Sequence, residues 1–301
     1  MGKATRKAEF APAFRSFQGY LEGTEKSLHT VKSYRLDLLA FEEFLRTSYR
    51  KQIALDQVGP GDLDAYHDSL KSRNLKTNTR RRMLMTVRRF LSFLHQRKKI
   101  PVDLGRTLLT PLKLERIPVT VSRVELLAKI RELPHRTVLE ARNRALLWTL
   151  SETGCLVSEL GKLRFDQLKM EKSQAFIEIE GKSPRKVPVD FKLAEALKEL
   201  ESSSKKSPWI FVGHNKFGSL GSPISSRGVE HLVQYFAHKA GFKDLTPRIF
   251  RHSAVLYWFQ QGILPDEVQK RLGLKSQYAF RAFQSAIKSS SEKTSSSQNR
   301  P

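Results

Sequence analysis

The sequence predicts a mainly helical protein with a small β component, divided into two domains. Three observations support this fold class. Apolar residues recur mostly at helical spacing, the spacing lapses between residues 100 and 122, and one short stretch after the lapse alternates as a strand does. With 301 residues, 39% of them hydrophobic, the chain is long enough for two ordinary cores. A wholly disordered polycation is therefore excluded.

The first domain, expected over residues 8–105, is predicted to be a small helical bundle. Apolar steps of three and four indicate helices over residues 10–20, after Ser27 or Thr30, and after Gly61. A fourth helix begins near Thr77. Its apolar stripe consists of Leu84, Val87, Leu91 and Leu94, with Met83 and Phe90 beside it. Prolines then punctuate residues 106–121, which we interpret as a linker.

The second domain, expected over residues 122–288, mixes helices with a β-hairpin. Alternation over residues 175–179, a turn over 181–185 and a return over 186–189 predict the hairpin. Helices are expected over residues 123–131, 142–152, 191–201, 225–240, 250–261, 266–272 and 278–287. The Ser-rich residues 289–301 are expected to be a disordered tail.

The charge is strongly positive, with a formal net charge of +24 and a pI near 10.2. No Asp or Glu occurs between Lys71 and Lys99, the densest basic segment. On the helix expected there, arginines seven residues apart share a face roughly opposite the apolar stripe. A solvated surface would explain most such runs, but here no acidic residue is interspersed for i,i+4 pairing. The pattern favours a nucleic acid over a membrane surface, with these candidate binding residues: Arg80, Arg81, Arg82, Arg88 and Arg89.

Other functional classes find little support in the sequence. No stretch approaches the roughly 18 to 20 apolar residues that a membrane span needs. A single cysteine, Cys155, allows neither an internal disulfide nor a thiolate zinc cluster. The histidines show no metal-ligand spacing with acidic partners. We expect a cytoplasmic protein with no metal, no cofactor and no membrane partner.

Five segments in a fixed order resemble the tyrosine recombinase (phage integrase-like) family, and within it the Xer-type recombinases. They are FQGYLEGTEKSLHTVKSYRLDLLAFEEFL, NLKTNTRRRMLMTVRRFLSFLHQRKKIP, ARNRALLWTLSETGCLVSELGKLRFDQL, and IEGKSPRKVPVD followed by TPRIFRHSAVLYWFQQGILPDEVQKRLGL. The resemblance implies a helical, SAM-like core-binding domain and a mixed α/β catalytic-type domain that together clamp duplex DNA. It also implies cleavage through a 3′-phosphotyrosyl bond, with two arginines, a lysine and two further side chains around the phosphate.

The resemblance places each catalytic position in this chain. In the family motif T-G-x-R-x-S-E-L, Leu156 occupies the place of the first arginine. Lys182 matches the hairpin lysine, and Arg251 matches the second arginine of H-x-x-R-H, while Arg248 replaces the first histidine of that motif. Only Lys182 and Arg251 therefore match by identity. Arginine binds phosphate oxygens bidentately, so Lys182, Arg248, Arg251 and the adjacent His252 are candidate DNA contacts.

Two further positions bear on the cutting chemistry. Leu274 stands where the family has the histidine of L-G-H, and Phe283 stands at the place of the nucleophilic tyrosine. A phenyl ring has no oxygen, so no phosphotyrosyl bond can form at Phe283. Tyr278 lies five residues earlier, a rotation of about 140° on a helix, and Tyr257 is interpreted as a core residue.

These residues lead to two hypotheses about function. The first is a non-cleaving, recombinase-derived protein that binds duplex DNA in an architectural or regulatory role, associated with the nucleoid. It would act as a homo-oligomer on DNA or as an inert partner of an active recombinase. The alternative is an active site-specific recombinase with an unusual site. A third possibility, an interaction module with residual DNA affinity, fits the positive charge less well.

Overall fold

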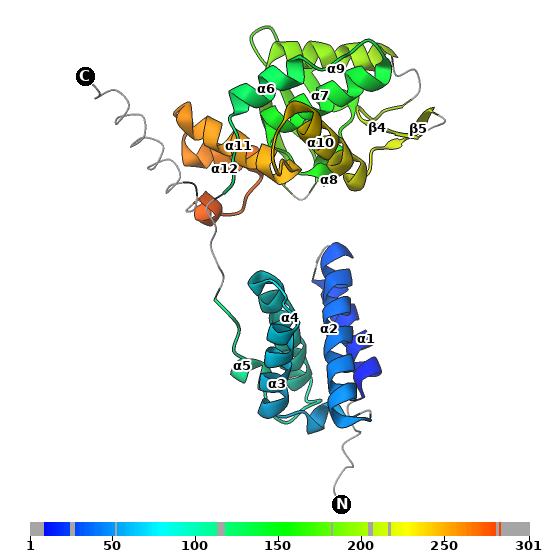
Figure 1. Ribbon diagram of the computed structural model, residues 1–301, viewed down its shortest axis with the longest axis vertical. Helices are drawn as coiled ribbons and strands as arrows, with labels where there is room; N and C mark the ends of the chain where they lie inside the picture. The colour runs from blue at the N-terminus through cyan, green and yellow to red at the C-terminus, as the bar shows by residue number, and fades with distance from the viewer. Residues whose placement is uncertain are drawn as a thin grey trace, which may run out of the picture. The chain divides into compact units, whose positions relative to one another are not determined.

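The computed structural model describes residues 9–24, 28–51, 53–112, 118–181, 183–203, 207–215, 218–280 and 283 (Figure 1). The chain divides into two compact units, residues 1–115 and 116–301. Most of the described residues are helical, and the strands form two small sheets. The predicted fold class, mainly helical with a small β component, is confirmed.

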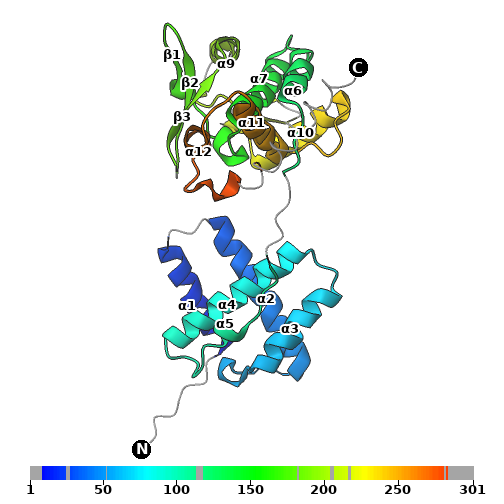
Figure 2. The same ribbon diagram turned by 90° about the vertical axis from the view of Figure 1, so that its left-hand side faces the viewer.

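The first unit is a helical bundle. Its helices are α1 (Phe10–Gly23), α2 (Leu28–Tyr49), α3 (Pro60–Ser72), α4 (Thr77–Gln96) and α5 (Leu104–Thr107), with a 3₁₀ turn η1 (Leu55–Gln57). Helix α4 packs against the other four helices (Figure 2). The predicted stripe on α4 is buried, with Leu84, Val87 and Leu91 at 0% exposure. Burial of this stripe is what holds α4 in the bundle.

Two details of this unit differ from the sequence prediction. Helix α3 begins at Pro60 rather than after Gly61, because the Asp62 carboxylate accepts a hydrogen bond from the Gly59 N–H at 2.8 Å. Proline suits the first helical position, because it has no N–H that would be left without a partner there. The short helix α5 was not predicted. Asp103 caps it by accepting from the Gly105 N–H at 3.1 Å.

The second unit surrounds the central helix α7. Its helices are α6 (Arg123–Arg131), α7 (Val138–Thr153), α8 (Val157–Leu160), α9 (Phe191–Ser203), α10 (Ser226–Ala240), α11 (Pro247–Gln260) and α12 (Pro265–Leu272), with 3₁₀ turns η2 (Phe165–Gln167) and η3 (Gln277–Phe280). Helix α7 packs against α6, α9, α11 and β3, and Leu146, Leu147 and Leu150 on it are completely buried. All residues of α7 from Ala145 to Thr153 are buried, so the second half of this helix forms the centre of the core.

Two antiparallel sheets complete this unit. The first has the order β1-β2-β3, formed by β1 (Leu168–Met170), β2 (Ala175–Ile179) and β3 (Arg185–Val189), and Figure 2 shows α9 beside it. The second is the hairpin of β4 (Val212–Asn215) and β5 (Gly218–Pro223). Alternation correctly predicted β2 and β3. Two elements were not predicted. Strand β1 has only three residues, and glycines interrupt any apolar pattern in the hairpin β4–β5.

Helix boundaries in this unit shift where capping side chains decide them. Helix α7 starts at Val138, four residues earlier than predicted, because Thr137 and Glu140 form a reciprocal capping box. Helix α11 starts at Pro247, where Thr246 caps it, rather than at Phe250. The start of the last predicted helix is the 3₁₀ turn η3. Of its remainder only residue 283 belongs to the described part of the chain, and the expected tail lies outside that part.

Candidate functional site

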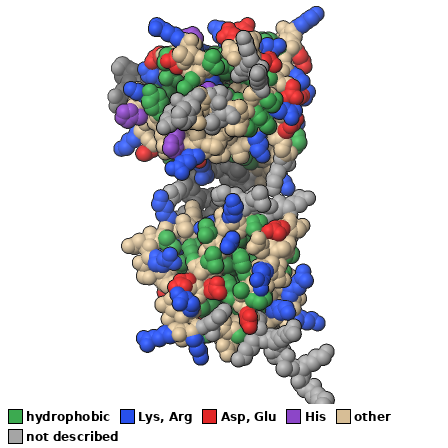
Figure 3. All heavy atoms as spheres, turned by 90° about the vertical axis from the view of Figure 1, so that its right-hand side faces the viewer, with side chains coloured by type: hydrophobic (Ala, Val, Ile, Leu, Met, Phe, Trp, Pro, Cys, Tyr) green, Lys and Arg blue, Asp and Glu red, His purple; other side chains and the backbone are tan. Residues whose placement is uncertain are grey.

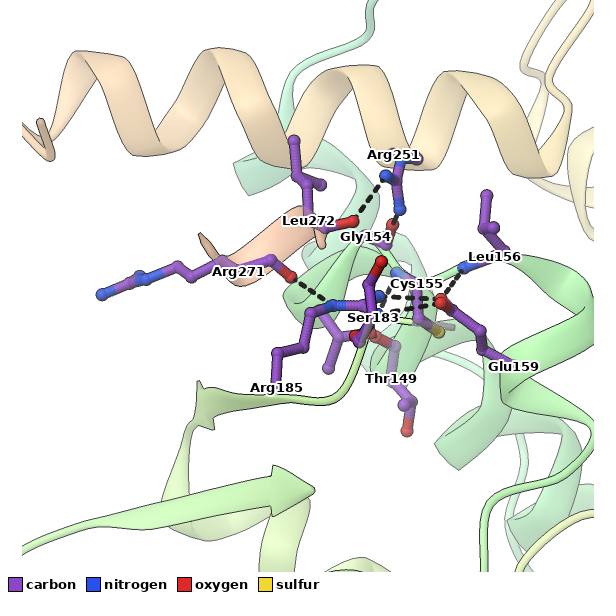
Figure 4. A network of polar contacts seen from close by, with 11 residues as sticks. Thr149, Gly154, Cys155, Leu156, Glu159, Ser183, Arg185, Arg251, Arg271 and Leu272 are labelled. Carbon is purple, nitrogen blue, oxygen red and sulfur yellow. Dashed lines mark hydrogen bonds and ion pairs between the residues drawn. The ribbon is translucent and has the colours of Figure 1, made fainter. Parts of the chain in front are cut away.

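The family-motif segments meet at one place in the second unit, between the end of α7, helix α8, the β2–β3 turn, α11 and the end of α12 (Figure 4). Helix α7 ends at Gly154, whose φ of 54° lies in the left-handed region. A Cβ atom there would sit 3.4 Å from Ala254 on α11 and 3.5 Å from Leu272 on α12. Glycine therefore lets the chain leave α7 in contact with both later helices.

Arg251, on α11, lies at the centre of this site. Its Nη1 donates to the Gly154 carbonyl at 2.7 Å and its Nη2 donates to the Leu272 carbonyl at 2.9 Å (Figure 4). Both carbonyls belong to helix C-termini, where unpaired carbonyls carry partial negative charge. Burial lowers the pKa of Arg251, although the nearby Glu159 carboxylate opposes that shift. Arg251 thus ties the ends of α7 and α12 together.

A second arginine, Arg185, was not predicted to belong to the site, since it stood at the end of the expected turn over residues 181–185. It opens β3 with its side chain 4% exposed and binds both Glu159 oxygens, at 2.8 and 2.7 Å. Its Nε donates to the Arg271 carbonyl at 2.7 Å. Arg185 shares a strand face with the buried Val187 and Val189, so the alternation did contain the signal for an inward-facing arginine.

Glu159 connects this arginine to the start of α8. Its Oε2 accepts a hydrogen bond from the Leu156 N–H at 2.8 Å, which caps the short helix. Burial alone would raise the pKa of Glu159, but the hydrogen bonds from Arg185 and Leu156 outweigh burial and lower that pKa. An ionised Glu159 therefore holds α8 and strand β3 together. In turn, Arg185 holds both to α12.

The structure places the expected catalytic positions as follows. Leu156 precedes α8 with 48% of its surface exposed, next to the segment that Arg251 contacts. Leu274 is partly buried against the core, and Phe283 is 5% exposed within the same core. Lys182 lies outside the described residues. Its neighbour Ser183 lies against Gly273, where an added Cβ would approach the Ser183 Cβ to 2.9 Å, so the β2–β3 turn reaches the site.

His252 contacts both Arg248 and Phe283. The exposed Arg248 donates from Nε to His252 Nε2 at 3.3 Å, while His252 Nδ1 lies 3.3 Å from the Val119 carbonyl. These contacts fit a neutral ring that accepts at Nε2 and donates from Nδ1. Burial and the charges of Arg248 and Arg251 lower the pKa of His252, against the opposing Val119 contact. The Phe283 ring packs edge-on against the imidazole, with ring centroids 5.4 Å apart.

The two tyrosines considered as substitutes differ in what the structure describes. Tyr257 is partly buried against the core, and the Arg123 guanidinium lies 4.2 Å from its ring centroid. It lies six residues after Arg251 on α11, a rotation of about 240° at ~100° per residue, so the two side chains leave the helix in different directions. The side chain of Tyr278 lies outside the described residues.

The arginines on α4 have more partners within the protein than the sequence indicated. Arg82 pairs with Asp37 of α2 at 2.5 Å, and Thr86 donates to the same carboxylate at 2.9 Å. The expectation of an unpaired face was wrong for Arg82, because its acidic partner comes from another helix. Arg81 donates to the Pro111 carbonyl at 2.8 Å and to the Thr110 hydroxyl at 3.3 Å. Arg89 donates to the Tyr34 hydroxyl at 2.5 Å and Arg80 to Thr77 at 3.3 Å, while Arg88 is half-buried.

The faces of the two units seen in Figure 3 are basic. In the faces of the two units that Figure 3 shows, Lys and Arg side chains are more widespread than Asp and Glu. Within the described residues, no helix combines the length and apolar character needed to cross a bilayer. Among the same residues, no group of three or more His, Cys, Asp and Glu side chains gathers as metal ligands would.

Comparison with known proteins identifies the same architecture. Residues 121–283 match the phage integrase family, and residues 14–98 match the phage integrase N-terminal SAM-like domain. Tyrosine recombinase XerD of Vibrio cholerae is 26% identical over 252 residues, which cover 81% of this chain and 82% of that protein. Tyrosine recombinase XerC of Xylella fastidiosa is 29% identical over 249 residues, covering 82% of each.

Solved structures with this fold include complexes with DNA. The XerH site-specific recombinase bound to a palindromic difH substrate superposes with a TM-score of 0.74 at 20% identity, covering 91% of this chain and 81% of that one. A lambda integrase dimer bound to a core site gives a TM-score of 0.68 at 14% identity, covering 93% and 78%. At these identities the likeness establishes the fold.

Proposed function

The chain belongs to the phage integrase family, and we propose that it binds duplex DNA without cutting it. Its role would be architectural or regulatory, on nucleoid DNA, as a homo-oligomer or as an inert partner of an active recombinase. The carrying observation is Phe283. This side chain has no nucleophilic atom, and it packs within the core with 5% of its surface exposed.

The surroundings of Leu156 support the same proposal. The first arginine of the family motif would supply half of the cationic clamp on the scissile phosphate, and a leucine carries no donor. Leu156 is 48% exposed, so no neighbour requires an apolar side chain at that point. Arg251 remains, with Nη1 and Nη2 each donating to a main-chain carbonyl. Each of these nitrogens has a second N–H, which could still bind a phosphate without any bond being broken.

Retained DNA binding is supported by the charge and by the relatives. The net charge is +24, and the family's solved structures include recombinases bound to DNA. Arg81, Arg88 and Arg89 on α4 have no carboxylate partner among the described residues. Their charges are therefore available to phosphates. The affinity should fall with ionic strength, with a slope of roughly −0.9 in log–log form for each phosphate neutralised.

The experiment has two stages. Chromatin-wide mapping first identifies the bound DNA, and a nicked suicide duplex of that sequence then traps any covalent adduct. We expect salt-dependent binding with no adduct. A flat salt response would contradict DNA binding as the main role, whereas an adduct would contradict the absence of cleavage.

The alternative, an active recombinase with an unusual site, is favoured by one finding, which is that the curated relatives are named tyrosine recombinases. If an adduct forms, Y257F and Y278F variants, singly and together, identify its tyrosine. Loss of the adduct in Arg251→Ala, with retained folding, would then support this alternative. The distribution of bound DNA adds a further distinction, because a few sharp sites fit a recombination target and broad coverage fits a nucleoid organiser.

A further inference from the structure

Tyr20, on α1, exposes an aromatic ring at the surface of the first unit. The residue is 46% exposed, whereas Phe17 and Phe93, against which its ring packs, are 1% and 5% exposed. The centroid of the Tyr20 ring lies 6.2 Å from that of Phe17, with an angle of 25° between the ring planes, and 5.0 Å from that of Phe93. The two buried rings therefore support Tyr20 from the core side, and nearly half of the residue stays open to solvent.

Two arginines from α4 and its C-terminal cap lie against other rings of this aromatic cluster. The Arg97 guanidinium lies over the Phe93 ring, 5.4 Å from its centroid, and both residues follow Arg89 along one face at steps of four. The Arg89 guanidinium lies over the ring of Tyr34 at 5.9 Å, and that ring stacks on Phe17. Arg89 and Arg97 are exposed, and neither forms an ion pair with a carboxylate of the described residues. The cluster is thus apolar inside and cationic at its rim.

No carboxylate of the described residues borders Tyr20 on its own face of α1. The positions one turn away, 16, 17, 23 and 24, are uncharged. Glu22 lies two residues beyond Tyr20, a rotation of about 200°, and it accepts a hydrogen bond from Gln18 at 3.0 Å. Helix α4 contains no Asp or Glu. The charges beside the exposed ring therefore attract an anionic partner, whereas Arg89 and Arg97 would repel a cationic one.

Exposed aromatic rings bordered by arginine suit single-stranded nucleic acids, because a base stacks on the ring while the cations attract the phosphates. In a duplex the neighbouring base pairs cover both faces of each base, so only an unpaired base can stack on a ring of the protein. Tyr20 thus fits an unpaired base. Arg89 and Arg97 lie about 12 Å apart along the axis of α4, which leaves room for separate phosphates of one strand.

We infer that Tyr20, Arg89 and Arg97, together called the Tyr20 surface, bind single-stranded DNA by stacking an unpaired base on the Tyr20 ring. The inference goes beyond the proposed function, which concerns duplex DNA, and the two can be tested separately. It gives the first unit an affinity for DNA whose strands are open, in addition to the attraction between its arginines and duplex phosphates.

The test compares two fluorescently labelled probes by anisotropy, an oligothymidine of about 15 nucleotides and a mixed-sequence duplex. Tyr20→Ala should weaken the binding of oligothymidine by about fivefold or more, which corresponds to the lower end of the contribution of one stacked base. It should leave the affinity for the duplex unchanged. Tyr20→Phe keeps the ring and should bind both probes as the wild type does. Arg97→Gln should reduce the salt slope for oligothymidine by about 0.7, the value for one phosphate of a single strand.

Tyr49→Ala is the matched control. Tyr49, on α2 of the same unit, is 39% exposed, but its hydroxyl donates to the Asp62 carboxylate at 2.8 Å. A carboxylate therefore lies beside this ring, where the Tyr20 surface has cations, and Tyr49→Ala should leave the affinity for oligothymidine unchanged. Thermal unfolding followed by circular dichroism verifies that each variant folds. If Tyr20→Ala does not fold, Tyr20→Leu, which still covers Phe93, takes its place.

The inference is wrong if the wild type binds the duplex but not oligothymidine. It is also wrong if Tyr20→Ala changes the two affinities by the same factor or leaves both unchanged, and the exposed ring would then be assigned to an apolar contact with a protein partner. A loss in Tyr49→Ala as large as that in Tyr20→Ala would overturn it too, because the arginines would then make no difference. Binding of oligothymidine without binding of the duplex would overturn the proposed function and leave this inference in place.

Discussion

Removal of the Arg185 guanidinium should destabilise the second unit strongly. In Arg185→Met, the Glu159 carboxylate loses two charge-assisted hydrogen bonds, and the Arg271 carbonyl loses its donor. Breaking a buried ion pair by removing one partner costs about 3–5 kcal/mol. Glu159 is 18% exposed and keeps the Leu156 N–H, so water and the backbone offset part of this cost. The expected loss is therefore about 3 kcal/mol, at the lower end of that range.

The assay is unfolding by urea and, separately, by heat, each followed by tryptophan fluorescence. All three tryptophans, Trp148, Trp209 and Trp258, belong to the second unit, so the signal reports the unfolding of that unit alone. The shift in melting temperature should be roughly 6–12 °C, at ~2–4 °C per kcal/mol for a unit of this size. The urea m-value should stay the same, because the surface exposed on unfolding hardly changes.

Lys186→Met provides the control on the next residue of the same strand. Lys186 pairs with Glu178 at 3.2 Å, but its side chain is 66% exposed, and such surface pairs contribute about 0–1 kcal/mol. The reasoning is wrong if Arg185→Met costs no more than Lys186→Met. In a double-mutant cycle, Glu159→Gln combined with Arg185→Met should cost clearly less than the sum of the single changes, because both remove the same pair.

Three further predictions concern other parts of the protein. The wild type should be more stable than Glu159→Gln, and this advantage should be complete above the unfolded-state pKa of glutamate, about 4.3. It should decline as the pH falls through the lowered folded-state pKa of Glu159, because protonation of Glu159 breaks its ion pair with Arg185. An advantage in urea unfolding that persists in acid would contradict this. The combined variant L156R/L274H/F283Y should form a covalent adduct on the nicked duplex where F283Y alone does not, and failure of the combination would mean that further groups have been lost. Asp37→Asn should cost the first unit no more than about 1 kcal/mol, as measured by circular dichroism, because burial raises the pKa of Asp37 and so offsets most of what Arg82 and Thr86 contribute. A loss of about 3 kcal/mol or more would contradict this.

The sequence predicted the helices well because their evidence is local. The apolar stripe of α4 repeats within a few residues, and each of its members is buried as expected. Helix starts were less accurate where a cap decided them, as at Thr137, since a cap depends on one side chain rather than on a periodic pattern. The strand β1 and the hairpin β4–β5 were missed because neither shows an alternating run long enough to recognise.

The site was predictable in part, and the reason lies in sequence separation. The resemblance pointed to Leu156, Arg251 and Phe283 through short motifs, and the structure brings their segments together. The pair of Arg185 and Glu159 escaped notice because its members lie 26 residues apart, and Asp37 lies 45 residues from Arg82. No periodicity connects such residues. Only the folded chain shows that Asp37 of α2 supplies the carboxylate that pairs with Arg82 on α4.

Contacts within the protein explain which charged groups of the site can be lost without harm to the fold. Replacing Arg251 would leave the Gly154 and Leu272 carbonyls without their donor, and an unsatisfied buried carbonyl costs about 1–3 kcal/mol. The Leu156 position is 48% exposed and contributes its backbone N–H, not its side chain, to the cap of α8. The cap of α8 therefore does not depend on the side chain at this position, and Leu156→Arg should leave the stability of the unit unchanged. The scaffold of the site is thus kept for reasons of folding whether or not the protein cuts DNA, and the presence of Arg251 is by itself no evidence of catalysis.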